Sequence, residues 1–257
     1  MGQSCHILLI NMDRSSERLE QCQRKFAAAG LEFERVAGID GSHLSESEVA
    51  QYTSPNLSAQ QYHRELSRGE IGCYLSHRKA WQTIVDRQLP YALVLEDDFE
   101  VIGNVDKAFE AIEKLDASEQ SWDCIKLATY RHRERKVLYR QPLENMELVT
   151  FAKVPAGTCA QVVSLEGAKQ LLKHSAHFAR PVDTDLQHWW ERGVEIMGLH
   201  PFVFHAEDDV VSEIDTVSQR AKPKRHRLRR LAQQVGAWYK GFIETRKLVI
   251  RQQQLQR

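Results

Sequence analysis

Three consecutive carboxylates, Glu96, Asp97 and Asp98, directly follow the apolar run 91–95, whose entry is marked by Pro90. An unbroken apolar run is typical of a strand buried on both faces of a parallel sheet. The carboxyl ends of such strands line the ligand crevice of open α/β sheets. Three like charges there repel one another unless a cation offsets them. The pattern therefore predicts a divalent-metal site, and a solvated acidic loop is the alternative.

More candidates lie in the last third of the chain. Asp183 and Asp185 open a short helix, where the helix dipole favours acids and where a carboxylate can also act as a general base. His205 precedes a second acidic triplet, residues 207–209, which follows no clean apolar run. We take His205 as the only possible metal ligand of that stretch, and a surface loop as the simpler account of the acids.

Basic and amide side chains lie at the end of the first strand and at the start of the helix that follows it. An apolar strand at 5–12, a helix and a second strand at 31–37 form a βαβ unit, in which the strand exits share one edge. Asn11, Arg14 and Arg18 thus become candidates for contacting a nucleotide. An exposed helix face that pairs with neighbouring glutamates is the alternative for the two arginines.

Strand and helix continue to alternate after this unit. A long helix at 67–85 carries His77, and a lone histidine there is more often packed and hydrogen-bonded than catalytic. Residues 42–67 are polar and irregular, which predicts a loop or lid. We interpret the basic residues at 131–136 as a solvated hairpin rim rather than a phosphate site. The alternation predicts an α/β fold with a mainly parallel, Rossmann-like mixed sheet.

The formal net charge is zero, with 35 Lys and Arg against 35 Asp and Glu, but the charges are unevenly placed. Residues 222–257 contain 11 bases and one acid, so residues 1–221 contain 24 bases and 34 acids. We therefore divide the chain into a catalytic or folded body, 1–221, and a basic amphipathic C-terminal tail, 222–257.

A helix through this tail would carry one apolar stripe between basic residues. The stripe comprises Leu228, Leu231, Val235, Trp238, Phe242 and Val249, with Tyr239 and Ile243 beside it. Such a helix fits an anionic membrane surface. Docking on the chain's own body is an alternative, and the stripe argues against a nucleic-acid partner. The first residues lack a signal-sequence pattern, and the five cysteines are too widely spaced for a disulfide framework or a zinc site. We expect a cytoplasmic chain.

Taken together, these motifs resemble glycosyltransferase family 25, the bacterial lipooligosaccharide galactosyltransferases and relatives of the collagen galactosyltransferases. The resemblance covers roughly residues 5–215 and depends on the order and spacing of its pieces. These are residues 10–14 with Arg18, 36–41, 69–77, 90–98, 157–158, 167–172 and 181–183.

The resemblance implies a GT-A type nucleotide-sugar fold, a UDP-sugar donor, Mn²⁺ or Mg²⁺, and inversion at the anomeric carbon. On this reading Asp98 binds the metal, Glu96 or Asp97 faces the ribose or donor sugar, and Asp183 or Asp185 is the base. Asp183 matches the family's Pro-x-Asp position. Relatives more often show Gln or another polar residue where this chain has His205. The donor-binding candidates within the motifs are Asn11, Arg14, Arg18, Asp40, His77, Glu96 and Asp97.

The resemblance also implies an acceptor substrate and a cellular location. We expect transfer of β-galactose from UDP-galactose to a lipid-linked oligosaccharide of lipopolysaccharide or lipooligosaccharide. The enzyme would be peripheral on the inner face of the bacterial inner membrane. Transfer of glucose or another hexose to a different glycan, or a non-catalytic nucleotide-sugar binding or scaffold protein, are the alternatives.

Overall fold

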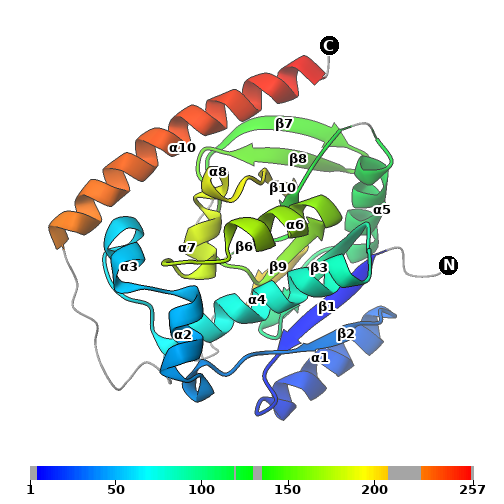
Figure 1. Cartoon of the computed structure of the whole chain (residues 1–257). Coiled ribbons are helices and arrows are strands. Elements are labelled where there is room, and N and C mark those ends of the chain that lie inside the picture. The colour runs from blue at the N-terminus through cyan, green and yellow to red at the C-terminus, as the bar shows by residue number, and fades with distance from the viewer. Residues whose placement is uncertain (1–4, 119, 130–134, 208–226, 256–257) are drawn as a thin grey trace.

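A large mixed sheet forms the centre of the protein (Figure 1). The computed structural model describes residues 5–118, 120–129, 135–207 and 227–255. In spatial order the sheet contains β2 (Glu34–Ala37), β1 (His6–Asn11), β3 (Tyr91–Glu96), β9 (Ala160–Ser164), β5 (Cys124–Lys126), β10 (Ile196–His200), β8 (Met146–Phe151) and β7 (Val137–Leu143). Only β9 and β8 run against the other six strands. The predicted α/β fold with a mainly parallel, mixed sheet is confirmed.

Helices cover both faces of this sheet, so that the core has two layers. On one face lie α1 (Ser16–Ala29) and α5 (Val105–Asp116), packed on alternate strand residues such as Leu93 and Leu95. On the other lie α4 (Arg68–Asp86) and α6 (Leu165–His174), packed on the intervening residues such as Val94. This alternation explains why the run 91–95 is apolar throughout, because β3 is buried on both sides.

A second, smaller sheet continues from the carboxyl end of the first. It contains β4 (Phe99–Val101), β11 (Phe204–Ala206) and β6 (Ala128–Thr129), in that order. β11 runs antiparallel to β4, with Ala206 opposite Phe99. The small sheet therefore brings the chain around residue 205 beside the acidic triplet, although the two are far apart in sequence.

Residues 42–67 are largely helical, so the prediction of an irregular loop was wrong. They form a 3-10 turn, η1 (Gly41–His43), and two short helices, α2 (Glu46–Tyr52) and α3 (Pro55–Gln61). Ser45 caps α2 in a reciprocal capping box with Glu48, and Ser54 caps α3. Polar residues that looked like loop chemistry are in fact helix-starting signals.

The tail forms one long helix, α10 (Arg227–Leu255), lying along the body beside α8 (Trp189–Arg192) and β8 (Figure 1). Its inner face is buried at Thr245, Leu248 and Gln252, and the amide of Gln252 accepts a hydrogen bond from Thr150 Oγ1 at 2.6 Å. The predicted boundary between residues 221 and 222 lies outside the described residues.

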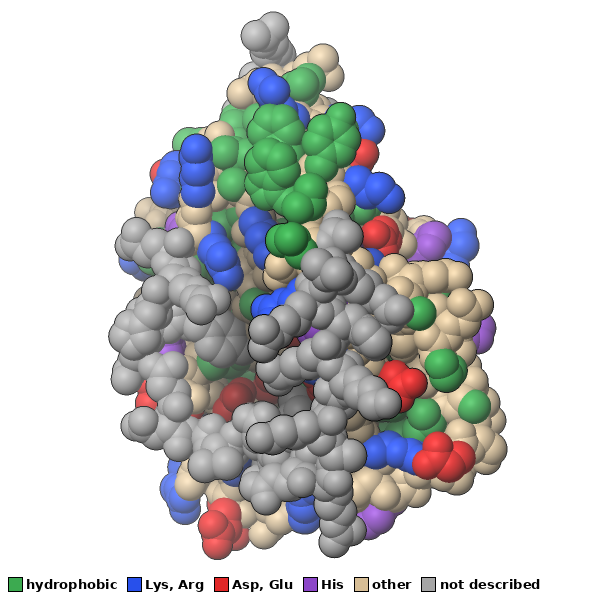
Figure 2. Space-filling model, turned by 90° about the vertical axis from the view of Figure 1, so that its left-hand side faces the viewer, with side chains coloured by type: hydrophobic (Ala, Val, Ile, Leu, Met, Phe, Trp, Pro, Cys, Tyr) green, Lys and Arg blue, Asp and Glu red, His purple; other side chains and the backbone are tan. Residues whose placement is uncertain are grey.

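The apolar stripe predicted for this helix is not the face that packs on the body. Leu231, Val235, Trp238, Tyr239 and Phe242 are exposed, Trp238 by 70 %. Figure 2 shows hydrophobic side chains gathered on one part of this side of the molecule, with Lys and Arg beside them. No helix within the described residues is both long and apolar enough to cross a membrane.

Candidate active site

The carboxyl ends of β1 and β3 lie side by side and set the position of the site. Ile10 of β1 is in register with Glu96 of β3, so Asn11 and Asp97 follow at the same edge of the sheet. Parallel pairing places strand exits together in this way, and here it brings residues 86 positions apart into contact.

Asp97 is held by the first βα unit. One carboxylate oxygen accepts a hydrogen bond from Asn11 Nδ2 at 2.7 Å, and the other pairs with Arg18 Nη1 at 3.1 Å. Asn11 is itself buried, and its amide oxygen accepts from Arg35 Nε at 3.0 Å. The structure thus brings the predicted residues Asn11, Arg18 and Asp97 together as one network. The side-chain amide of Asn11 is thus engaged within the protein, since its Nδ2 donates to both Asp97 and Ser15 O.

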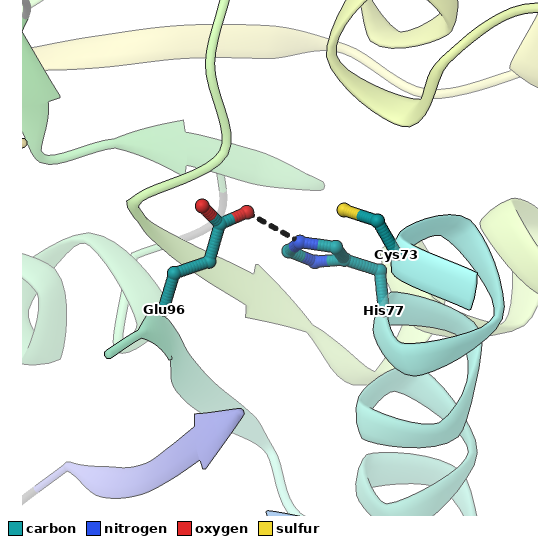
Figure 3. A group of neighbouring side chains, drawn as sticks. All are labelled: Cys73, His77 and Glu96. Carbon is teal, nitrogen blue, oxygen red and sulfur yellow. Dashed lines mark hydrogen bonds and ion pairs between the residues drawn. The ribbon is translucent and has the colours of Figure 1, made fainter. Parts of the chain in front are cut away.

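Glu96 is held from the opposite side by α4 (Figure 3). His77 Nε2 lies 2.8 Å from Glu96 Oε1, and Thr158 donates to the same oxygen. Burial raises the pKa of Glu96, but these hydrogen bonds and the charge of Lys126 outweigh it, so the pKa lies below its usual value. Glu96 is therefore an oriented anion.

Cys73 completes a group of three possible ligand atoms, with His77 and Glu96, that lie within 4.8 Å of one another. All three side chains point toward a common centre in Figure 3. Burial, and then the charges of Glu96 and Asp183, raise the pKa of the Cys73 thiol well above its ordinary value. Cys73 is therefore a neutral thiol here, and the group contains a single oriented carboxylate rather than a set of anionic ligands.

Asp98 differs from its two neighbours because Oδ1 is buried and has no hydrogen-bond partner among the described residues. Burial raises the pKa of Asp98 to about 7, and the charges of Glu96 and Asp97 add to the effect. A buried carboxylate beside two like charges is unfavourable in its ionised form, and a bound cation would stabilise that form.

His205 lies on β11, next to the strand that follows Asp98. The backbone N–H of Glu207 donates to Asp98 O at 2.8 Å, which ties the two segments together. Phe99 and Ala206 face the core, so alternation along the ladder puts His205 on its other face. His205 is buried, and within the described residues neither of its ring nitrogens has a hydrogen-bond partner.

Asp98 and His205 fit a divalent cation by their chemistry. A carboxylate oxygen and an imidazole nitrogen are ligands that Mn²⁺ accepts, and buried polar atoms without partners are costly. Both residues have such atoms in segments joined by one backbone hydrogen bond. Within the second acidic group, Glu207 is engaged by Lys25. Asp208 and Asp209 lie outside the described residues.

Arg14 and Asp40 form a second, more exposed pair beside the edge. Asp40 also accepts from Ser42 N at 2.9 Å and so caps η1. The backbone there lies against α4: a Cβ on Gly72 would come within 2.5 Å of Ile39 O. Two motifs of the family resemblance, 36–41 and 69–77, are therefore in direct backbone contact.

The two aspartates of α7 (Val182–Leu186) have opposite environments. Asp185 is fully buried and accepts from Tyr74 Oη at 2.6 Å and Arg192 Nε at 2.6 Å, with Arg180 Nη1 at 3.1 Å. A carboxylate neutralised by two arginines is a poor proton acceptor, so this geometry speaks against Asp185 as the base.

Asp183 is partly exposed, and among the described residues its hydrogen bonds are local: Oδ1 accepts from Thr184 N at 2.6 Å. Its charge acts on both Cys73 and Lys126, as does that of Glu96. Asp183 therefore faces the same region as the acidic triplet.

Lys126 is a buried residue that the motif reading missed. It ends β5, is 2 % exposed, and donates to Gly157 O. Burial lowers the pKa of Lys126, and the nearby negative charges of Asp183 and Glu96 oppose this. The sequence did contain a signal for this residue. Lys126 ends the short apolar strand β5 as Glu96 ends β3, so it could have been predicted to lie near the site.

A mixed α/β sheet with acidic residues at its carboxyl edge is consistent with an α/β glycosyltransferase. Residues 4–186 match the model of glycosyltransferase family 25, described as "LPS biosynthesis protein". The chain belongs to this family.

Curated relatives extend over part of the chain. It is 31 % identical over 180 residues to a glycosyltransferase 25 family member of Drosophila melanogaster, covering 69 % of this chain and 28 % of that protein. It is 28 % identical over 170 residues to procollagen galactosyltransferase 2 of Homo sapiens, covering 65 % and 27 %. For procollagen galactosyltransferase 1 of Danio rerio the identity is 25 % over 238 residues, covering 82 % and 39 %. The chain therefore spans well under half of each relative.

Proposed function

We propose that this protein transfers a hexose, β-galactose from UDP-galactose, to a saccharide acceptor of lipopolysaccharide or lipooligosaccharide, with inversion at the anomeric carbon. Membership of family 25 and relatives named as galactosyltransferases support the transfer of galactose. The family description supports the acceptor class. A GT-A type arrangement is part of this proposal.

The observation that carries the proposal is the contrast within the acidic triplet. Glu96 and Asp97 have hydrogen-bond partners, whereas Asp98 Oδ1 has none among the described residues and lies beside the segment carrying His205. Asp98 and His205 would hold Mn²⁺ or Mg²⁺. When bound, the cation offsets the charge that develops on the diphosphate leaving group.

The chain's own residues do the rest of the work in this proposal. Asp97 and Glu96, fixed by Arg18 and His77, receive the ribose or donor-sugar hydroxyls. Asp183 accepts the proton of the acceptor hydroxyl, because it is partly exposed and no arginine among the described residues pairs with it. Asp185 orients α7 through its buried ion pairs.

The direct test measures UDP release from a panel of UDP-sugars with Mn²⁺, with and without acceptor. We expect release to be fastest with UDP-galactose. A faster rate with UDP-glucose would replace the donor assignment. No release with any donor, from folded protein, would leave a nucleotide-sugar binding protein instead of an enzyme.

Two substitutions separate the roles within the site. Asp98→Asn should abolish turnover and metal-dependent UDP binding, whereas Asp183→Asn should lower turnover and leave UDP binding intact. Normal UDP affinity and rate in Asp98→Asn would contradict the metal assignment. Loss of UDP binding in Asp183→Asn would place that residue in donor binding.

We also propose that α10 lies on an anionic membrane, which would make the enzyme peripheral on the cytoplasmic face of the inner membrane. Its outer face carries exposed apolar residues, and its only acid is Glu244. Each basic residue near such a surface contributes about 1 kcal/mol of attraction. Apolar side chains would add binding that salt does not screen.

Liposomes that contain phosphatidylserine test this proposal. Leu231→Ser with Tyr239→Ser removes exposed apolar surface from α10 and should weaken liposome binding at high salt. Lys169→Gln, an exposed change on α6, is the control. Equal binding by the wild type, the double variant and a chain ending at Arg220 would exclude α10 as the membrane contact.

A further inference from the structure

A pocket of about 810 Å³ lies between α10 and the body. Its walls come from three places: the end of α3, the loop 152–156 and the segment 184–190, with α10 along the open side. Trp238 and Phe242 of the exposed stripe line it as well. The volume is in the range of small-molecule sites, so the gap can hold a ligand of sugar size.

The charge of this pocket is entirely positive among the described lining residues. No Asp or Glu lines it, whereas Arg135, Lys153, Arg180 and Arg230 do. Arg180 is committed to Asp185 and Glu191. Within the described part of the chain no carboxylate pairs with the other three. Their charges are therefore available to an anionic ligand.

Lys153 lies in the loop 152–156 that walls the pocket, and its side chain is exposed. Desolvation by the surrounding protein still lowers the pKa of its ammonium, and the charge of Arg135 acts in the same direction. A bound anion would relieve both effects. An anion bound at Lys153 would also meet the charge of Arg135, so removing Lys153 should weaken its binding.

Two buried polar atoms at the pocket also have no hydrogen-bond partner among the described residues. They are Gln61 Oε1, an acceptor, and Trp190 Nε1, a donor. Sugar hydroxyls both donate and accept, so a saccharide that reaches either atom would satisfy it. The rings of Tyr62, Trp190 and Trp238 supply flat apolar surface for a pyranose.

The pocket adjoins the candidate base. Thr184 lines it, and the same residue's N–H donates to Asp183 Oδ1 at 2.6 Å. On another wall Ala156 precedes Gly157, whose carbonyl accepts from Lys126. A saccharide in the pocket would thus lie next to the residues that face the donor site.

We infer that this pocket is the acceptor subsite, and that it takes an anionic saccharide, one bearing a phosphate or carboxylate. That the bound saccharide is the acceptor rests on the proposed function. The pocket adds the charge of that substrate and the place where it binds. Lys153 and the unpaired arginines bind the anionic group, and the aromatic rings and orphaned polar atoms bind the sugar.

Calorimetry with lactose 1-phosphate tests the pocket without requiring turnover. Lactose without the phosphate should bind at least about tenfold more weakly, because charge-assisted hydrogen bonds supply the difference. Lys153→Gln should raise Kd for lactose 1-phosphate about tenfold. Lys153→Arg should restore binding, and Lys169→Gln on α6 should leave it unchanged.

Three outcomes would overturn the inference: equal affinity for the two sugars, unchanged Kd in Lys153→Gln, or displacement of lactose 1-phosphate by UDP with Mn²⁺. The last would put the sugar phosphate in the donor site. These results are separate from the fate of the proposed function. UDP release from UDP-galactose with unchanged Kd in Lys153→Gln refutes the pocket alone. Absence of UDP release with retained dependence on Lys153 refutes the enzyme alone.

Discussion

Replacing Asp98 with Asn should make the metal-free protein more stable. The pKa of Asp98 is raised from 3.8 to about 7, so the folded state holds a proton that the unfolded chain has lost between these values. Wild-type stability should therefore fall as pH rises from about 4 to 7. Three units at about 1.4 kcal/mol each give about 4 kcal/mol. Partial access of the side chain to solvent reduces this to about 2–4 kcal/mol.

Urea unfolding in EDTA at pH 5 and pH 8 measures this effect. Asp98→Asn should exceed the wild type by about 2–4 kcal/mol at pH 8 and by clearly less at pH 5, where the wild-type carboxyl is protonated. Asp97→Asn is the matched control. It weakens the contacts to Asn11 and Arg18, so it should destabilise the protein. A gain in Asp98→Asn that does not grow with pH would refute the reasoning.

Further expected outcomes concern neighbouring positions. His205→Phe should keep stability in urea but lower Mn²⁺ affinity by calorimetry at least about tenfold, and unchanged affinity would remove His205 from the site. Asp185→Asn should cost about 3 kcal/mol in urea, against less than about 1 kcal/mol for Asp183→Asn, since only the first removes a buried carboxylate charge, which pairs with Arg192 and Arg180; similar losses would contradict the contrast. Gly72→Ala should cost about 2 kcal/mol or more in urea, because its Cβ would approach Ile39 O, and a neutral effect would show that the contact relaxes.

Long apolar patterns were sufficient to predict the framework. The run 91–95 is buried on both faces, which produces a pattern that sequence reading detects without knowing the partners. The ends of the longer helices also carry local signals: Ser67 caps α4 in a capping box with Glu70, and Gly30 ends α1 at φ 66°. These signals are local, so they survive without tertiary information.

Features that depend on tertiary contacts were not predictable in the same way. Asp183 and Asp185 look alike in sequence, and what distinguishes them is the approach of Tyr74, 111 positions away, together with the ion pairs to two arginines. Likewise, no sequence motif indicates that the ammonium of Lys126 lies beside Gly157 O, because the fold brings these residues together. The buried face of α10 consists of Thr245, Leu248 and Gln252. Two of these residues are polar, so a search for an apolar stripe does not predict this face.

That polar inner face has a consequence for how the molecule would find its substrate. Because α10 is fixed to the body through Thr245, Leu248 and Gln252, any surface touching its outer face meets the protein in one orientation. If that surface is a bilayer, the mouth of the pocket stands at a constant height above the lipid headgroups. The search for acceptor then becomes lateral diffusion in two dimensions. On that condition, glycans would be selected by the distance of their growing end from the lipid.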